Sequence, residues 1–156
     1  MSAEITQRLN RTAEALETFA VAESDRPFGN LHDVPGRGQA MSPTFTYDYL
    51  GSENLTGTVV FSDFYLGASA VHGGAIPLIF DEVLGRLANE QRPASRTAYL
   101  HVDYRRITPT DKVLRIDARV DRVDGRKVLV SGILRDGSTL LAEAEGLFVI
   151  LRSDQP

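Results

Sequence analysis

The part of the sequence with the clearest chemical potential is the run VHGGAIPLIFDE, which extends from Val71 to Glu82. Two consecutive glycines, Gly73 and Gly74, precede an apolar segment with helical spacing, and glycine lets a ligand approach the backbone closely. The first amide groups of a helix have no partner inside the helix and lie at the positive end of its dipole. This helix start is therefore suited to stabilise negative charge that develops on a substrate oxygen.

Asp81 is the acidic residue of this run that we expect to act on a substrate. Pro77 and Gly85, four positions away on either side, are small and leave room beside the carboxylate. Partial desolvation at the border of the apolar stripe would strengthen Asp81 as a base. Glu82 is instead predicted to face solvent and to pair with Arg86 at the i,i+4 spacing. Taken singly, these features also fit an ordinary helix, and only their combination favours a site.

Hydrophobic periodicity predicts the elements that position this run. A first helix has apolar positions from Ile5 to Ala20, and a Pro/Gly-rich loop covers residues 25–43. Further along, we predict strands over 44–50 and 57–64, a helix over 72–92, and strands over 97–107, 112–123, 126–135 and 139–151. Asp-Gly pairs at 124–125 and 136–137 are typical of tight hairpins. The predicted fold class is α+β, with an antiparallel sheet of about six strands, the last four as a meander, packed on one long helix.

Composition limits the protein classes that need to be considered. The chain has 156 residues, a net charge of -4 and no cysteine, which indicates one globular domain without disulfides. We divide it into an N-terminal helix and loop, 1–43, and a main part, 44–156. The acidic balance argues against a nucleic-acid partner. No apolar run reaches the ~20 residues of a membrane span and no secretory signal is visible, so we expect a cytoplasmic protein. His32 beside Asp33 has no suitably spaced third ligand, and no metal is predicted.

A family resemblance follows from two motifs. His72-Gly73-Gly74 followed by Asp81, and the later run from Thr97 to Arg106, resemble the PaaI-like acyl-CoA thioesterases of the hotdog fold over residues 57–151. The resemblance implies a sheet wrapped around one long central helix, in a homodimer or dimer of dimers with active sites at the subunit interface. It also implies an acyl-CoA substrate and no separate cofactor.

The resemblance assigns roles to individual residues. The Gly73 amide would polarise the thioester carbonyl, His72 would help to position it, and Asp81 of the facing subunit would be base or nucleophile. Thr97 matches the Ser/Thr that orients the attacking water in some members. Some members have an asparagine six residues before the histidine, where this chain has Leu66. The residues expected to contact substrate or coenzyme A are Gly74, Arg105, Arg106, Arg126 and Lys127.

The expected reaction is hydrolysis of an acyl-CoA thioester. A hydratase or dehydratase of the same fold and a non-catalytic acyl-CoA-binding module are the alternatives. The four basic residues have a second interpretation as solvated sheet residues, and His101 is predicted to be structural or at an interface. The sequence contains neither a Gly-x-Ser-x-Gly elbow nor a phosphate-binding Gly-Lys-Ser/Thr motif, which argues against serine hydrolases and P-loop proteins.

Overall fold

The computed structural model describes residues 3–22, 25 and 41–154. The chain divides into two compact units, Met1–Gln39 and Ala40–Pro156. The first unit contains helix α1 (Ala3–Glu17), which confirms the predicted N-terminal helix. Most of the predicted loop over 25–43, including His32, lies outside the described residues.

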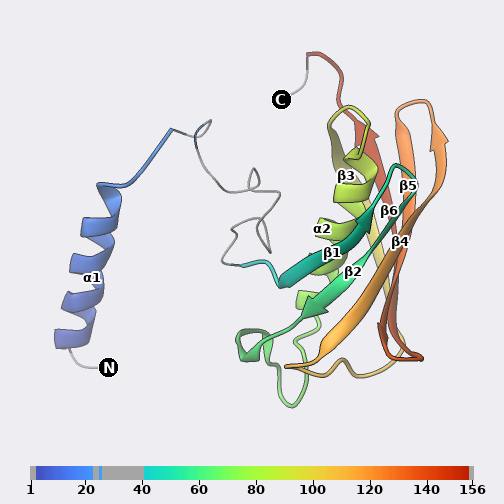
Figure 1. Cartoon of the computed structure of the whole chain (residues 1–156). Helices are drawn as coiled ribbons and strands as arrows, with labels where there is room; N and C mark the ends of the chain where they lie inside the picture. The colour runs from blue at the N-terminus through green and yellow to red at the C-terminus, as the bar shows by residue number, and fades with distance from the viewer. Residues whose placement is uncertain (1–2, 23–24, 26–40, 155–156) are drawn as a thin grey trace. The chain divides into compact units, whose positions relative to one another are not determined.

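The second unit is a six-stranded sheet with one long helix, and Figure 1 shows the helix lying against the sheet. Its elements are β1 (Thr44–Leu50), β2 (Asn54–Val60), the 3-10 turn η3 (Asp63–Tyr65), α2 (Ala75–Asn89), β3 (Ser95–Tyr104), β4 (Val113–Asp124), β5 (Lys127–Asp136) and β6 (Thr139–Ile150). All neighbouring strands are antiparallel. The predicted fold class is confirmed, although β2 begins earlier than expected and gives way to η3.

The order of the strands corrects one prediction. The sheet runs β1-β2-β4-β5-β6-β3, so β3 pairs with β6 and not with β4. Only β4, β5 and β6 form a meander, with Gly125 and Gly137 at φ +56° in the two tight turns. The connection from β3 to β4 contains no such turn, and β4 therefore pairs with β2 on the other side of the sheet. As a result β3 is an edge strand with one unpaired side.

Helix α2 packs closely on one face of the sheet (Figure 1). Two strand glycines allow this approach, because a Cβ added at Gly132 would lie 3.0 Å from the α2 residue Leu84 and one at Gly146 would lie 3.4 Å from the same side chain. The predicted apolar stripe of α2 is fully or almost fully buried: Ile76, Phe80, Val83, Leu84 and Leu87. Burial of this stripe fixes the rotation of α2 and so determines which side chains flank it.

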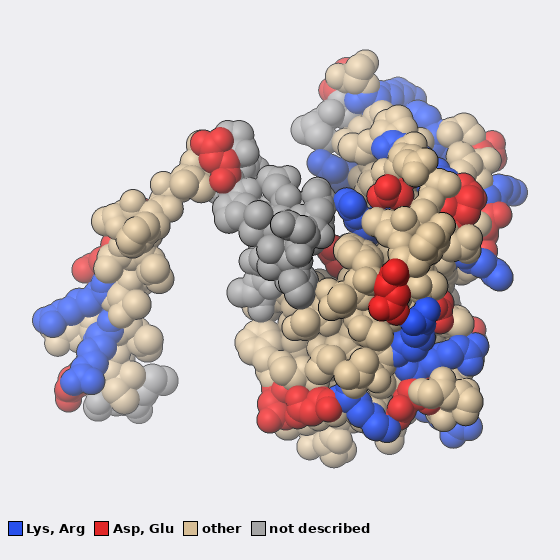
Figure 2. All heavy atoms as spheres, viewed as in Figure 1, with Lys and Arg blue, Asp and Glu red and all other residues tan. Residues whose placement is uncertain are grey.

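The opposite face of the sheet is polar, because Arg115 and Asp117 alternate along β4 with the buried Leu114 and Ile116. Arg115 bridges Asp48 and Asp117 there, and Arg119 pairs with Asp121. Acidic and basic side chains are interspersed on the part of the second unit seen in Figure 2. Within the described residues, none of the helices has the length and apolar character needed to cross a membrane.

Candidate active site

The segment that leads into α2 is held by backbone hydrogen bonds on both sides. The Val71 N–H donates to the Thr108 carbonyl at 3.0 Å, and the His72 N–H donates to the Tyr65 carbonyl at 2.7 Å. Leu66 forms an isolated bridge with Val71. These contacts fix the start of the helix in place, but the apolar Leu66 side chain offers no hydrogen-bond donor.

The amide groups at the helix start differ in what they bind. The Gly74 N–H donates to His72 Nδ1 at 3.0 Å, and the Ala75 N–H donates to the His72 carbonyl at 2.9 Å. Among residues 71–75, and counting acceptors in the described part of the chain, only the Gly73 N–H has no acceptor. The Gly73 amide is therefore free to bind a substrate oxygen, whereas the Gly74 amide is already engaged.

The surroundings of Gly73 do not explain why this residue is glycine. A Cβ added there would meet nothing within 4 Å, and Gly73 is not among the residues with positive φ. The residue instead lines a hollow of about 410 Å³, together with Ile76, Tyr104, Arg106 and Ile107 among others. Open space beside an unpaired amide is the arrangement that a bound carbonyl group needs.

One hydrogen bond orients the His72 ring. Its Nδ1 accepts from the Gly74 N–H at 3.0 Å, so Nε2 is the ring nitrogen that remains to bind another group. The side chain is exposed. Nε2 has no partner among the described residues, which leaves it available for the expected role in positioning a carbonyl.

Asp81 and Thr97, to which the family resemblance assigns separate roles, are in direct contact. The Thr97 hydroxyl donates to Asp81 Oδ1 at 2.8 Å. Asn89, at the end of α2, accepts hydrogen bonds from the backbone N–H and the hydroxyl of Ser95 at 2.7 and 3.0 Å. This anchor ties the start of β3 to the end of α2, and Thr97 then lies two residues along the strand, beside the helix.

The solvent exposures predicted for Asp81 and Glu82 are wrong. Asp81 is exposed and Glu82 is half-buried in the protomer, the reverse of the expectation. The reason is that Asp81 flanks α2 on the side of β3, where the sheet ends and no further strand covers it. On the other flank, Arg86 Nη2 lies 3.6 Å from Glu90 Oε2.

The predicted catalytic residues form two separate groups within one protomer. Asp81 lies six residues into α2 from Ala75, which is about 9 Å along the helix axis, and Gly73 lies a further two residues before the helix begins. The first group contains His72 and Gly73, and the second contains Asp81 and Thr97. One protomer thus places the Gly73 amide and the Asp81 carboxylate too far apart to act on the same carbonyl carbon.

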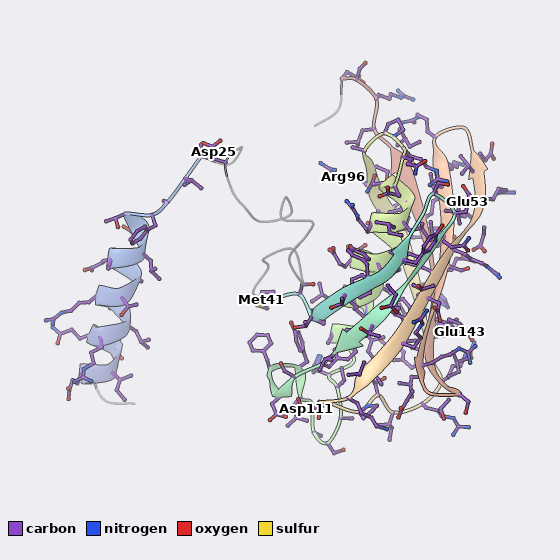
Figure 3. The ribbon with its side chains drawn as sticks, in the orientation of Figure 1. Asp25, Met41, Glu53, Arg96, Asp111 and Glu143 are labelled. Atoms are coloured by element: carbon purple, nitrogen blue, oxygen red, sulfur yellow. The ribbon has the colours of Figure 1, made fainter. Side chains whose placement is uncertain are left out.

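Arg105 and Arg106 lie beside the first group but differ in their partners. Arg105 donates to Glu143, a β6 residue labelled in Figure 3, and also to Asp103. The hydrogen bond and the charge of Glu143 raise the Arg105 pKa. Arg106 has no ion pair among the described residues, and it lines both the Gly73 hollow and an adjoining one of about 500 Å³ that includes Thr139. Arg106 is thus the available cation.

Arg126 and Lys127 lie at the opposite end of the sheet. Arg126 Nη1 donates to the Ile150 carbonyl at 2.9 Å, whereas the Arg105 N–H donates to the Leu141 carbonyl. Nine residues of extended strand separate these two positions on β6, which is about 30 Å. One protomer therefore does not bring the two predicted basic pairs together.

A third hollow, of about 510 Å³, lies on the sheet face turned away from α2. His101 lines it, with Nε2 3.4 Å from Asp103 Oδ1. This hollow contains none of the predicted catalytic residues. Among the described residues no group of three or more His, Cys, Asp or Glu side chains is arranged to hold a metal ion.

One contact was missed by sequence reasoning. The Tyr104 hydroxyl donates to the Gly73 carbonyl at 2.8 Å. No spacing rule relates residues 31 positions apart, and the sequence offers no signal beyond the place of Tyr104 just before Arg105 and Arg106.

Comparison with known proteins identifies relatives that are named as thioesterases. The thioesterase superfamily model matches residues 68–143. Acyl-coenzyme A thioesterase THEM4 of Mus musculus is 35% identical over 88 residues, covering 55% of this chain and 38% of that protein. The THEM4 protein of Xenopus laevis is 39% identical over 82 residues, covering 51% and 37%. The chain thus spans little more than a third of the length of these curated relatives.

Solved structures extend the similarity to nearly the whole chain. The crystal structure of protein RHA08564, a thioesterase superfamily protein, is 31% identical with a TM-score of 0.76 and covers 94% of this chain and 77% of that chain. Protein smu.793 of Streptococcus mutans UA159, solved with acetyl-CoA bound, is 17% identical with a TM-score of 0.66 and covers 69% and 89%. The second likeness concerns the fold alone. Together the matches confirm the predicted hotdog fold.

Proposed function

Because this chain belongs to the thioesterase superfamily, we propose that it hydrolyses an acyl-CoA thioester to a carboxylic acid and free coenzyme A. The observation that carries the proposal is the unpaired Gly73 N–H beside an open hollow at the start of α2. A thioester carbonyl placed there would have its oxygen on that amide and at the positive end of the helix dipole. Curated relatives named acyl-CoA thioesterases support the same substrate class.

The proposed reaction uses the two groups in turn. Asp81, with one carboxylate oxygen held by Thr97, takes a proton from water as the hydroxyl oxygen bonds to the carbonyl carbon. The negative charge that develops on the carbonyl oxygen is stabilised by the Gly73 N–H. Collapse of the tetrahedral intermediate breaks the C–S bond, and the leaving thiolate takes the proton from Asp81. The reaction consumes one water molecule, returns Asp81 to its starting state, and uses no metal or other cofactor.

A second copy of the chain completes the proposed site. The exposed edge of β3 has unpaired backbone groups that favour pairing with another strand. If two β3 strands pair antiparallel about a two-fold axis between Leu100 and His101, Tyr104 of one copy lies opposite Thr97 of the other. Tyr104 is hydrogen-bonded to Gly73 of its own chain, and Thr97 to Asp81 of its own chain. This pairing therefore brings Gly73 of one copy close to Asp81 of the other. The homodimer, and any dimer of dimers built from it, is therefore part of the proposal.

The shared site can be tested by mixing two inactive variants. Gly73→Pro lacks the amide donor and Asp81→Asn lacks the base, but each chain retains the half that the other has lost. In a mixed dimer one of the two sites is intact, so random reassociation of equal amounts should restore about one quarter of wild-type activity. Mixing without recovery, with exchange of subunits verified by mass spectrometry, would show that both groups act within one chain.

The reaction itself is tested by release of free thiol from a panel of acyl-CoAs. We expect thiol release that persists in the presence of EDTA. Binding of acyl-CoA without turnover would instead identify a binding module, and addition or loss of water on the acyl chain without thiol release would identify a hydratase or dehydratase.

A further inference from the structure

The peptide group between Gly73 and Gly74 is held by side chains at both ends. Its carbonyl oxygen accepts a hydrogen bond from the Tyr104 hydroxyl at 2.8 Å, and its N–H donates to His72 Nδ1 at 3.0 Å. Tyr104 ends β3, and His72 precedes α2. The edge strand is thus linked directly to the backbone that presents the unpaired Gly73 amide.

Two consecutive glycines would otherwise leave this backbone unusually free. Glycine has access to more backbone conformations than any other residue, and ordering it costs more entropy. An amide that stabilises an oxyanion is effective only if its direction is set before the reaction. Leu66 supplies no side-chain donor near the helix start, and Gly73 has the one backbone N–H among residues 71–75 without an acceptor in the described chain. The direction of this N–H therefore matters all the more.

We propose that Tyr104 is a positioning residue. It holds the Gly73–Gly74 peptide, while the preceding peptide, which carries the Gly73 N–H, is held through the His72 carbonyl by the Ala75 N–H. With both peptides held, rotation at Gly73 is limited and its N–H keeps its direction toward the hollow. This inference rests on the proposed thioesterase function. Tyr104 acts through the backbone and needs no contact with the reacting atoms. Because it ends the strand that pairs in the proposed dimer, it also connects the orientation of the amide to subunit assembly.

Core packing does not account for the contact. Tyr104 is 52% exposed and contributes nothing to the apolar core, so the ring is not held in this position by burial. The hydroxyl nevertheless reaches a carbonyl on another element with good hydrogen-bond geometry. An exposed tyrosine with no role would be free to leave its hydroxyl in water.

The test compares Tyr104→Phe with a matched control on the same strand, Tyr99→Phe. The Tyr99 hydroxyl also makes a single hydrogen bond, to Glu145 Oε1 at 2.7 Å, and Tyr99 is 41% exposed. Each variant of the full chain is measured for kcat, KM and Tm with an acyl-CoA that the wild type hydrolyses. Hydrogen exchange of the Gly74 amide is measured in parallel by NMR.

We expect Tyr104→Phe to lower kcat by about 3- to 10-fold, the effect of losing one neutral hydrogen bond, with KM and Tm equal to those of Tyr99→Phe. The Gly74 amide should exchange faster only in Tyr104→Phe. A kcat equal to that of the control would overturn the proposal. If the wild type hydrolyses no acyl-CoA, the proposed function fails, and the exchange comparison alone then decides: faster exchange in Tyr104→Phe supports the positioning role, and equal exchange refutes it.

Discussion

Replacing Gly73 with alanine tests whether glycine is required at this position for folding or for ligand binding. The added Cβ would meet no protein atom within 4 Å, and the backbone there is outside the positive-φ region. Alanine therefore fits the folded chain without strain. Because alanine also restricts the unfolded chain, the substitution should raise the free energy of unfolding by about 0.4–1 kcal/mol.

The effect on activity should have the opposite sign. The new methyl group occupies the hollow from which a carbonyl would reach the Gly73 N–H. If the carbonyl is displaced and loses this hydrogen bond, the rate of hydrolysis should fall by about 10²–10³-fold, as for loss of one oxyanion donor elsewhere. For a chain of this length the stability gain corresponds to an increase in Tm of about 1–4 °C.

The assay measures thiol release and thermal unfolding on the same preparation of Gly73→Ala. A more stable and much less active protein is the expected result. Full activity together with the higher Tm would show that glycine merely eases entry into α2, and the oxyanion assignment would then be refuted. Loss of both activity and stability would contradict the structural argument that the methyl group fits.

The remaining predictions concern the carboxylate and the coenzyme. Asp81→Asn keeps the acceptor for the Thr97 hydroxyl but removes the base, so kcat should fall by about 10²–10⁴-fold. The control Glu82→Gln should change kcat little. Similar losses of kcat in both variants would contradict the assignment of Asp81 as the base. Thr97→Ala removes one hydrogen bond to Asp81 and should lower kcat by about tenfold, an expectation that a kcat equal to wild type would refute. Arg106→Ala should raise KM for an acyl-CoA more than for the matching acyl-pantetheine, which lacks the nucleotide phosphates. Arg105→Ala, whose guanidinium is already bound to acidic side chains, should show a smaller difference, and equal KM ratios would argue against phosphate binding by Arg106.

Much of the fold was predictable because it depends on local patterns. The two Asp-Gly turns and the alternation of Leu114 and Ile116 with charged residues indicated the hairpins and the buried face. The partner of β3 was not predictable, since a long connection without a tight turn leaves strand pairing to the packing of the whole sheet. The contact between Thr97 and Asp81 was not predicted, although the family resemblance singled out both residues. It depends on the Asn89–Ser95 anchor, which no sequence pattern indicates.

The unexpected exposure of Asp81 supports the same arrangement as the unpaired edge of β3. In one protomer the carboxylate lies exposed at the sheet edge beside Thr97, in contact with water. A second copy paired along β3 would cover this edge with the helix start that carries Gly73, and would exclude water from the carboxylate and the amide together. Desolvation strengthens both interactions with a substrate. The partial burial that sequence reasoning assigned to Asp81 within its own helix is therefore expected to come from the partner subunit. We expect the protein to sediment as a dimer, and a stable monomer that hydrolyses acyl-CoA at the full rate would refute this account of how the site is completed.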